Sequence, residues 1–168
     1  MMRDRFMLKG FKFVGAFAGA ALVVGCAGMA PASKDVQRTF TYDYSAADVS
    51  REELWVRARD YFATTFGDSR SVLRVQDKEE TTLIGKGVAS WKLIGSERCF
   101  NNYHLKFMSK DGRARLELEL IEGVPSYSTC SGWPWPSQSG YEEIVSGFES
   151  FSAGLGGALN KESSFSDF

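Results

Sequence analysis

The stretch from residue 113 to residue 122 constrains the fold of this chain most strongly, because apolar and charged residues alternate along it. In this stretch Leu116, Leu118 and Leu120 alternate with Arg115, Glu117 and Glu119. A period of two places the leucines on one side of a β-strand and the charged residues on the other. The pattern therefore predicts a strand in an antiparallel sheet with one solvated face and one buried face, which another layer must cover.

Four other runs have the composition of strands, at residues 39–44, 71–77, 82–93 and 100–109. The run 100–109 also alternates, with Tyr103, Leu105 and Phe107 on one face and His104 and Lys106 on the other. Residues 109–112 read Ser-Lys-Asp-Gly, which is typical turn chemistry. The runs 100–109 and 113–122 are therefore predicted to form a hairpin.

A helix is predicted over residues 51–66. Ser50 and Glu53 have the spacing of a capping box, in which the serine side chain accepts a hydrogen bond from the first turn. Apolar residues then recur at helical spacing, and Gly67 supplies a left-handed stop.

A second helix is predicted to begin near Ser139, with Ser139 and Glu142 as another capping box, and glycines at 154, 156 and 157 weaken its end. Its apolar face carries Ile144, Phe148, Phe151 and Leu155. The order is then strand, helix, four strands and helix. It predicts an α+β domain over residues 36–160, in which an antiparallel sheet of about five strands is covered on one face by two helices, and then a loose tail over 161–168.

The N-terminal 25 residues have the organisation of an export signal. Basic residues stand at positions 3, 5, 9 and 12, and an uncharged apolar run extends from 13 to 24. That run has the length of a signal-peptide core and is too short to span a membrane. The sequence Val23-Val24-Gly25-Cys26 resembles the bacterial lipobox, which implies that Cys26 receives diacylglycerol and becomes the lipidated N-terminus of a membrane-anchored protein.

The alternative is an ordinary secretory signal that is cut near Ala30. If Cys26 is lipidated, residues 26–35 form a tether of small and polar residues. Ala27 follows the cysteine where inner-membrane retention commonly uses aspartate, so the expected location is the outer membrane, facing the periplasm.

Removal of the signal changes the charge of the chain. Lys plus Arg falls from 20 to 16 and Asp plus Glu from 21 to 20, which leaves a net charge of −4. An acidic domain repels polyanions, so nucleic acid is not expected as a partner.

The two remaining cysteines, Cys99 and Cys130, are expected to form a disulfide in an oxidising compartment. Two buried free thiols are the alternative. His104 is the single histidine of the chain, and no pair of cysteines has CxxC spacing. No zinc site and no cofactor are therefore expected.

The loop from 124 to 139 contains Trp133-Pro134-Trp135-Pro136. Two indoles on a loop stiffened by proline can bind a partner protein or a sugar ring of an envelope glycan, because proline lowers the entropy that binding costs. In the alternative, the tryptophans fold back as a lid over the sheet near the disulfide.

The middle of the chain resembles a family of proteins. The segments on which this resemblance rests are Leu54-Trp55, Tyr61-Phe62, Val72-Leu73, Asp77-Lys78-Glu79 and Ile84-Gly85-Lys86-Gly87. Together they resemble the domain-of-unknown-function family with a TATA-binding-protein-like (TBP-like) fold, over about residues 36–122. The resemblance implies that fold and a frequent lipoprotein or secretory signal. It implies no activity and no site, and the name of the fold does not imply DNA binding.

Patterns for catalysis are sparse. Asp77, Glu79 and Glu80 could serve as an acid pair in a hydrolase of envelope polymers, although such a cluster is typical of a solvated turn. Gly85 and Gly87 lie within a strand pattern and indicate a bulge or close packing rather than a phosphate loop. The sequence therefore predicts a non-enzymatic binding or scaffolding module anchored to the membrane, with a hydrolase or a purely structural lipoprotein as alternatives.

Overall fold

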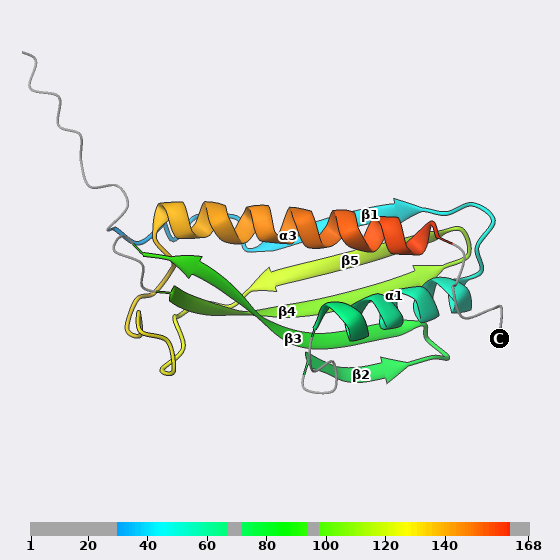
Figure 1. The fold of residues 1–168 in the computed structure, drawn as a ribbon, viewed down its shortest axis with the longest axis horizontal. Coiled ribbons are helices and arrows are strands. Elements are labelled where there is room, and N and C mark those ends of the chain that lie inside the picture. Colours follow the sequence, from blue (N-terminus) through cyan, green and yellow to red (C-terminus); the bar gives the residue numbers. More distant parts are fainter. Residues whose placement is uncertain (1–29, 67–71, 94–97, 162–168) are drawn as a thin grey trace, which may run out of the picture.

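The computed structural model describes residues 30–66, 72–93 and 98–161. Within these ranges the chain forms one antiparallel five-stranded sheet with two helices on one face, which confirms the predicted α+β class (Figure 1). The elements are β1 (Thr39–Ser45), α1 (Arg51–Thr65), β2 (Leu73–Asp77), β3 (Thr82–Lys92), β4 (Arg98–Lys110), β5 (Arg113–Leu120) and α3 (Gln138–Leu159).

The strand order in the sheet is β1-β5-β4-β3-β2. Consecutive strands from β2 to β5 pair in order, whereas β1 crosses over and pairs with β5, with Thr39 opposite Glu119 and Ser45 opposite Arg113. Helix α3 runs along the sheet, and α1 covers one end of β3 and β4 (Figure 1). We call the helix-covered face the inner face and the opposite one the outer face.

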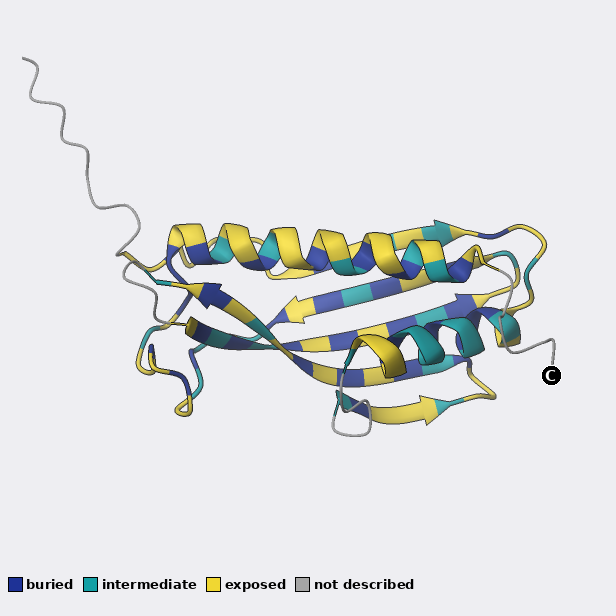
Figure 2. Ribbon diagram, viewed as in Figure 1, coloured by how far each residue is buried: buried dark blue, intermediate teal, exposed yellow. Residues whose placement is uncertain are grey.

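The alternation of the sequence decides which residues point to each face (Figure 2). The buried inward residues of β4 and β5 are Cys99, Asn101, Tyr103, Leu105, Phe107, Ser109, Ala114, Leu116, Leu118 and Leu120. Residues between them on β4, such as His104 and Lys106, are exposed. The predicted one-sided burial of these strands is confirmed.

Helix α1 begins as predicted. Ser50 Oγ accepts a hydrogen bond from the backbone N–H of Glu53 at 3.2 Å, and Asp111 Oδ1 accepts one from the N–H of Arg51 at 2.9 Å. The Glu53 carboxylate instead accepts from Arg57 Nε at 2.9 Å. The serine half of the capping box is therefore formed, and the aspartate of the β4–β5 turn satisfies a second backbone donor.

The predicted cap of the second helix is wrong. Helix α3 is capped by Ser137 rather than Ser139, because Ser137 Oγ accepts from the N–H of Gly140 at 3.0 Å. A cap residue requires extended backbone, and Ser137 has it because it forms an isolated β-bridge with Pro31. The bridge to Pro31, more than 100 residues earlier in the chain, therefore determines which serine caps the helix. The predicted capping box between Ser139 and Glu142 does not form.

Two glycines of α3 give opposite predictions. At Gly147 an added Cβ would meet nothing within 4 Å, so Gly147→Ala should raise the free energy of unfolding by about 0.5–1 kcal/mol. At Gly140 the Cβ would lie 2.7 Å from Cδ2 of Trp91, which is fully buried and donates to Asn101 Oδ1 at 2.9 Å. Gly140→Ala should therefore lower the free energy of unfolding by about 1–3 kcal/mol.

Urea denaturation of the two variants beside the unmodified protein measures both changes. Both variants replace glycine with alanine in the same helix, so the difference between them reports mainly on the surroundings, which are Trp91 at Gly140 and solvent at Gly147. An increase in stability for Gly140→Ala would show that Trp91 is free to move.

Candidate binding surface

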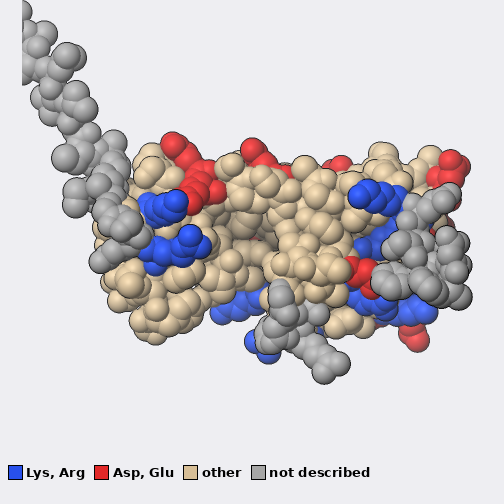
Figure 3. Space-filling view, viewed as in Figure 1, with Lys and Arg blue, Asp and Glu red and all other residues tan. Residues whose placement is uncertain are grey.

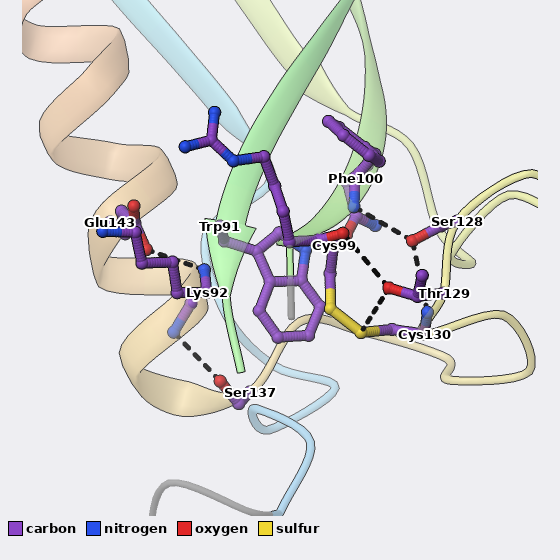
Figure 4. Close-up of a disulfide and its surroundings, with 12 residues drawn as sticks. Trp91, Lys92, Cys99, Phe100, Ser128, Thr129, Cys130, Ser137 and Glu143 are labelled. Carbon is purple, nitrogen blue, oxygen red and sulfur yellow. Dashed lines mark hydrogen bonds between the residues drawn. A yellow bond between two sulfur atoms is a disulfide. The ribbon is translucent and has the colours of Figure 1, made fainter. Parts of the chain in front are cut away.

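The disulfide predicted between Cys99 and Cys130 is present, and both side chains are buried (Figure 4). The two Cα atoms are 5.5 Å apart. Ser128 Oγ accepts from the backbone N–H of Phe100 at 3.1 Å and ties the same loop to β4. The alternative of two free thiols is wrong. The predicted lipidation site, Cys26, lies outside the described residues.

The two tryptophans of the proline-rich loop differ in their surroundings. Trp135 is 2% exposed, and the guanidinium carbon of Arg38 lies 4.5 Å from its ring centroid. Trp133 is half-buried, with its ring 6.1 Å from that of Trp91. The burial of Trp135 favours the alternative in which this side chain folds back over the sheet, whereas part of the Trp133 ring stays accessible to solvent. Binding through Trp133 and Trp135 stays a prediction.

The three acids considered for hydrolysis lie at the turn between β2 and β3. Asp77 Oδ1 accepts from the backbone N–H of Glu80 at 2.9 Å, which is the usual way in which aspartate stabilises a turn. Glu79 and Glu80 are exposed. The structure therefore brings these residues together in a solvated turn.

His104 is exposed on the outer face, where Nδ1 lies 3.5 Å from Glu119 Oε2. The two glycines of β3 lie on the inner face and allow close packing. A Cβ on Gly85 would lie 2.7 Å from the carbonyl oxygen of Val72, and a Cβ on Gly87 would overlap the ring of Tyr103. The packing role predicted for these glycines is consistent with these contacts.

The outer face carries a feature that the sequence did not reveal. Across the described ranges four large apolar or aromatic side chains are exposed: Val75 (44%), Ile84 (38%), Val88 (52%) and Tyr127 (62%). The three aliphatic residues belong to β2 and β3. We call these four residues the apolar stripe.

The pairing of the strands places the residues of the stripe on one face, with Lys86 between Ile84 and Val88. Val75 is opposite Ile84 in the β2–β3 register, and Ile84 and Val88 point the same way along β3. Val88 is in turn opposite Asn102 of β4, whose Oδ1 accepts a hydrogen bond from the Tyr127 hydroxyl at 2.9 Å. The stripe therefore crosses the outer face from the edge strand to the loop that follows β5.

Charged groups border the stripe. Lys86 lies between Ile84 and Val88 on the outer side of β3, and Lys106 is opposite Ile84 on β4. The helix-bearing side differs, because Asp and Glu side chains follow the edge formed by α3 (Figure 3). The exposed charged residues of α3 are Glu142, Glu143 and Glu149. Glutamates therefore follow α3, whereas two lysines lie within and beside the stripe, with Glu117 of β5 opposite Lys106.

A depression of about 480 Å³ lies at the hairpin end of β4 and β5, where β1 also ends. We call it the distal depression, and its lining includes Asp43, Met108, Lys110, Arg113 and Arg115. Arg115 donates to Asp43 from Nε at 2.7 Å and from Nη2 at 3.0 Å. The hydrogen bond from Arg115 lowers the pKa of the Asp43 carboxyl, which is therefore ionised at neutral pH.

Comparison with known proteins identifies the family. The family model described as "domain of unknown function (DUF4468) with TBP-like fold" matches residues 40–122. Residues 40–122 are a DUF4468 domain. This confirms the resemblance that the sequence indicated. No curated protein matches the chain.

Two solved structures share the fold of the DUF4468 domain. A DUF4468 family protein from Bacteroides ovatus has a TM-score of 0.57 and 12% identity, over 80% of this chain and 92% of that one. A TBP-like protein from Parabacteroides distasonis has a TM-score of 0.54 and 11% identity, over 74% of this chain and 94% of that one. At such identities the likeness shows the fold alone. Both alignments are longer than the family match and extend the similarity beyond residues 40–122.

Two tyrosines near the inner face of the DUF4468 domain have perturbed acidity. Burial raises the pKa of Tyr103 to about 12. Burial also raises the pKa of Tyr44 to about 12, and this rise is partly offset by its hydrogen bond with Ser152 Oγ at 2.8 Å. Both phenols are neutral at neutral pH, so neither supplies a base or an anionic nucleophile there.

Within residues 30–66, 72–93 and 98–161, no group of three His, Cys, Asp or Glu side chains is placed to hold a metal ion. In the same ranges, neither helix combines the length and the apolar character needed to cross a bilayer.

Proposed function

We propose that this protein is a lipid-anchored protein of the cell envelope whose domain is a non-enzymatic binding module, and that the apolar stripe contacts the partner. The observation that carries the proposal is the position of the stripe. Scattered exposed apolar residues are normal on protein surfaces, whereas apolar side chains grouped on one face among charged groups are typical of an interaction site. Here three of the four exposed large apolar side chains lie on the outer side of β2 and β3, and the hydroxyl of the fourth, Tyr127, donates to Asn102 of β4.

The charges beside the stripe indicate the chemistry of the partner. Lys86 and Lys106 are exposed beside Ile84, and neither forms an ion pair among the described residues. A partner that places apolar side chains on the stripe gains from carboxylates opposite these lysines, because complementary charge speeds association and fixes register. We therefore expect an envelope protein with an apolar surface bordered by Asp or Glu, in preference to a neutral glycan.

The anchor supports a location close to the bilayer. Pro31 forms a β-bridge with Ser137, which fixes this part of the chain to the start of α3. Between Cys26 and Pro31 the chain has room for a separation of about 17 Å at full extension. A lipid on Cys26 would therefore hold this end of the domain near the outer membrane, on its periplasmic side, and leave the outer face open to other envelope proteins.

The alternatives have less support. The acids that a hydrolase would use lie in a solvated turn, where Asp77 is engaged with the backbone of Glu80. A purely structural role would not explain why the apolar side chains of the stripe are exposed to solvent. Neither alternative is favoured by a contact in the described part of the chain.

Site-specific photo-crosslinking in cells of the native host tests the proposal. A crosslinker at Val88 should capture a defined partner, and one at Ser146, which is exposed on α3, should not. Reversing the charges of Lys86 and Lys106 to Glu should abolish the Val88 product, while Lys161→Glu, at the far end of α3, should leave it unchanged.

Identical crosslinked products from Val88 and Ser146, or no product from Val88, would contradict the proposal that the apolar stripe is the binding surface. If the Val88 product persists after Lys86 and Lys106 are changed to Glu, the proposal of an acidic partner surface is wrong. In the same cells Cys26→Ser should move the protein from the membrane fraction to the soluble fraction, and continued membrane association would contradict the lipid anchor.

A further inference from the structure

The distal depression lies on the same outer face as the apolar stripe, shares no residue with it and has a different composition. It is formed where β1 and β4 end and β5 begins, with Ser45 opposite Arg113, Asp43 opposite Arg115, and Lys110 opposite Arg113. The stripe instead lies over β2, β3 and the loop after β5. The two features can therefore be tested separately.

The charges in the distal depression are unbalanced. Its lining contains three cationic side chains, from Lys110, Arg113 and Arg115, and one carboxylate, from Asp43. Asp111 of the β4–β5 turn lies outside the lining, and its Oδ1 accepts from the first backbone N–H of α1 at 2.9 Å. Cations thus outnumber carboxylates within the lining itself, and the nearby acids Asp111 and Glu117 stand outside it.

The one carboxylate also organises its partner. Arg115 uses Nε and one Nη2 hydrogen on Asp43, which fixes the plane of the guanidinium and leaves three of its five N–H groups for another acceptor. Lys110 and Arg113 make no ion pair within the described ranges. The depression therefore combines the oriented guanidinium of Arg115 with two cationic side chains, those of Lys110 and Arg113, that form no ion pair among the described residues.

We propose that the distal depression binds an oxyanion, a carboxylate or phosphate group carried by a small molecule or by a polymer unit. Planar donors beside mobile cations are the usual means of holding such groups, because charge-assisted hydrogen bonds are stronger than neutral ones. Met108 supplies an apolar wall, which suits a ligand whose anionic group is attached to a carbon skeleton. The site goes beyond the partner surface proposed above and does not depend on it.

Titration of the full-length chain in detergent, followed by ¹H–¹⁵N correlation spectra at constant ionic strength, tests the site. Inorganic phosphate and succinate are the two probes. We expect saturable shifts that are confined to residues 43–45 and 108–115. Tighter binding of phosphate assigns a phosphate-bearing ligand, and tighter binding of succinate assigns a carboxylate.

Variants then locate the site. Arg113→Gln should weaken the tighter probe about tenfold, because it removes a charge-assisted hydrogen bond. Lys161→Gln, a change of the same charge outside the depression, should leave the affinity unchanged, and so should Val88→Asp in the stripe. Because the residue-by-residue map comes from the unmodified protein, the result does not depend on how a variant folds.

Shifts that rise linearly without saturation, or that spread equally over other exposed lysines such as Lys86, would overturn the site. Unchanged affinity in Arg113→Gln would also overturn it. Neither result would bear on the crosslinking test of the apolar stripe.

Discussion

Replacing Phe62 with alanine should lower the free energy of unfolding by about 3–5 kcal/mol. Phe62 is fully buried, and its ring centroid lies 5.7 Å from that of Phe151 on α3 and 6.1 Å from that of Phe107 on β4. Truncation removes packing against both layers at once and leaves a cavity, because the helix and the sheet are each held by other contacts. Urea unfolding followed by circular dichroism measures the loss.

Tyr127→Ala provides the control for this measurement. Tyr127 is 62% exposed, so its truncation should change the free energy of unfolding by less than about 1 kcal/mol, although it also removes an aromatic ring. A loss below 1 kcal/mol for Phe62→Ala would show that the junction of α1, α3 and the sheet is not the centre of the core.

Removal of the disulfide should cost about 3–4 kcal/mol of stability in the chain-entropy model. Cys99 and Cys130 are 31 residues apart in the sequence, and their bond closes the segment that contains the β4–β5 hairpin. The double variant Cys99→Ala with Cys130→Ala leaves no unpaired thiol at this site and has more conformational freedom in the unfolded state. Its midpoint in urea should fall relative to that of the oxidised protein.

Reduction provides an independent measurement of the same bond. The unmodified protein, once mass spectrometry shows that it is fully reduced, should unfold at a urea concentration close to that of the double variant. The double variant itself should not respond to the reductant. Equal stability of the oxidised and reduced unmodified protein would contradict the contribution assigned to the bond.

Prediction from sequence succeeded where the signals are local. The start of α1 is fixed by Ser50 and Glu53, three residues apart, and the structure has the helix at Arg51–Thr65. The strand β5 was recognised from alternation within ten residues, and it forms at Arg113–Leu120. Such signals act through hydrogen bonds and side-chain directions of near neighbours, so they are readable before the fold is known.

Prediction was weaker where two local solutions were equivalent. Ser137 and Ser139 can both cap a helix, and the bridge between Ser137 and Pro31 decided for the first. Trp133 and Trp135 stand two residues apart in the same loop, yet Trp135 is buried and Trp133 is half-buried. Nothing in a window of a few residues distinguishes the members of these pairs, because the deciding contacts come from distant segments.

The candidate surfaces depended almost entirely on the tertiary structure. Strand β3 has apolar residues on both faces, with Leu83 inward and Ile84 outward, so the pattern alone does not say which face the helices cover. The distal depression brings Asp43 and Arg115 together across 72 positions of sequence through the pairing of β1 with β5.

The sequence by itself predicted the strands, the helices and the family from residue spacing along the chain, and the disulfide from the two cysteines that remain besides Cys26. Only the tertiary structure decided the choice of helix cap, the burial of Trp135, the apolar stripe and the cationic depression. These features arise from the crossover of β1 and from the packing of both helices on one face, and such long-range arrangements set which side chains meet solvent.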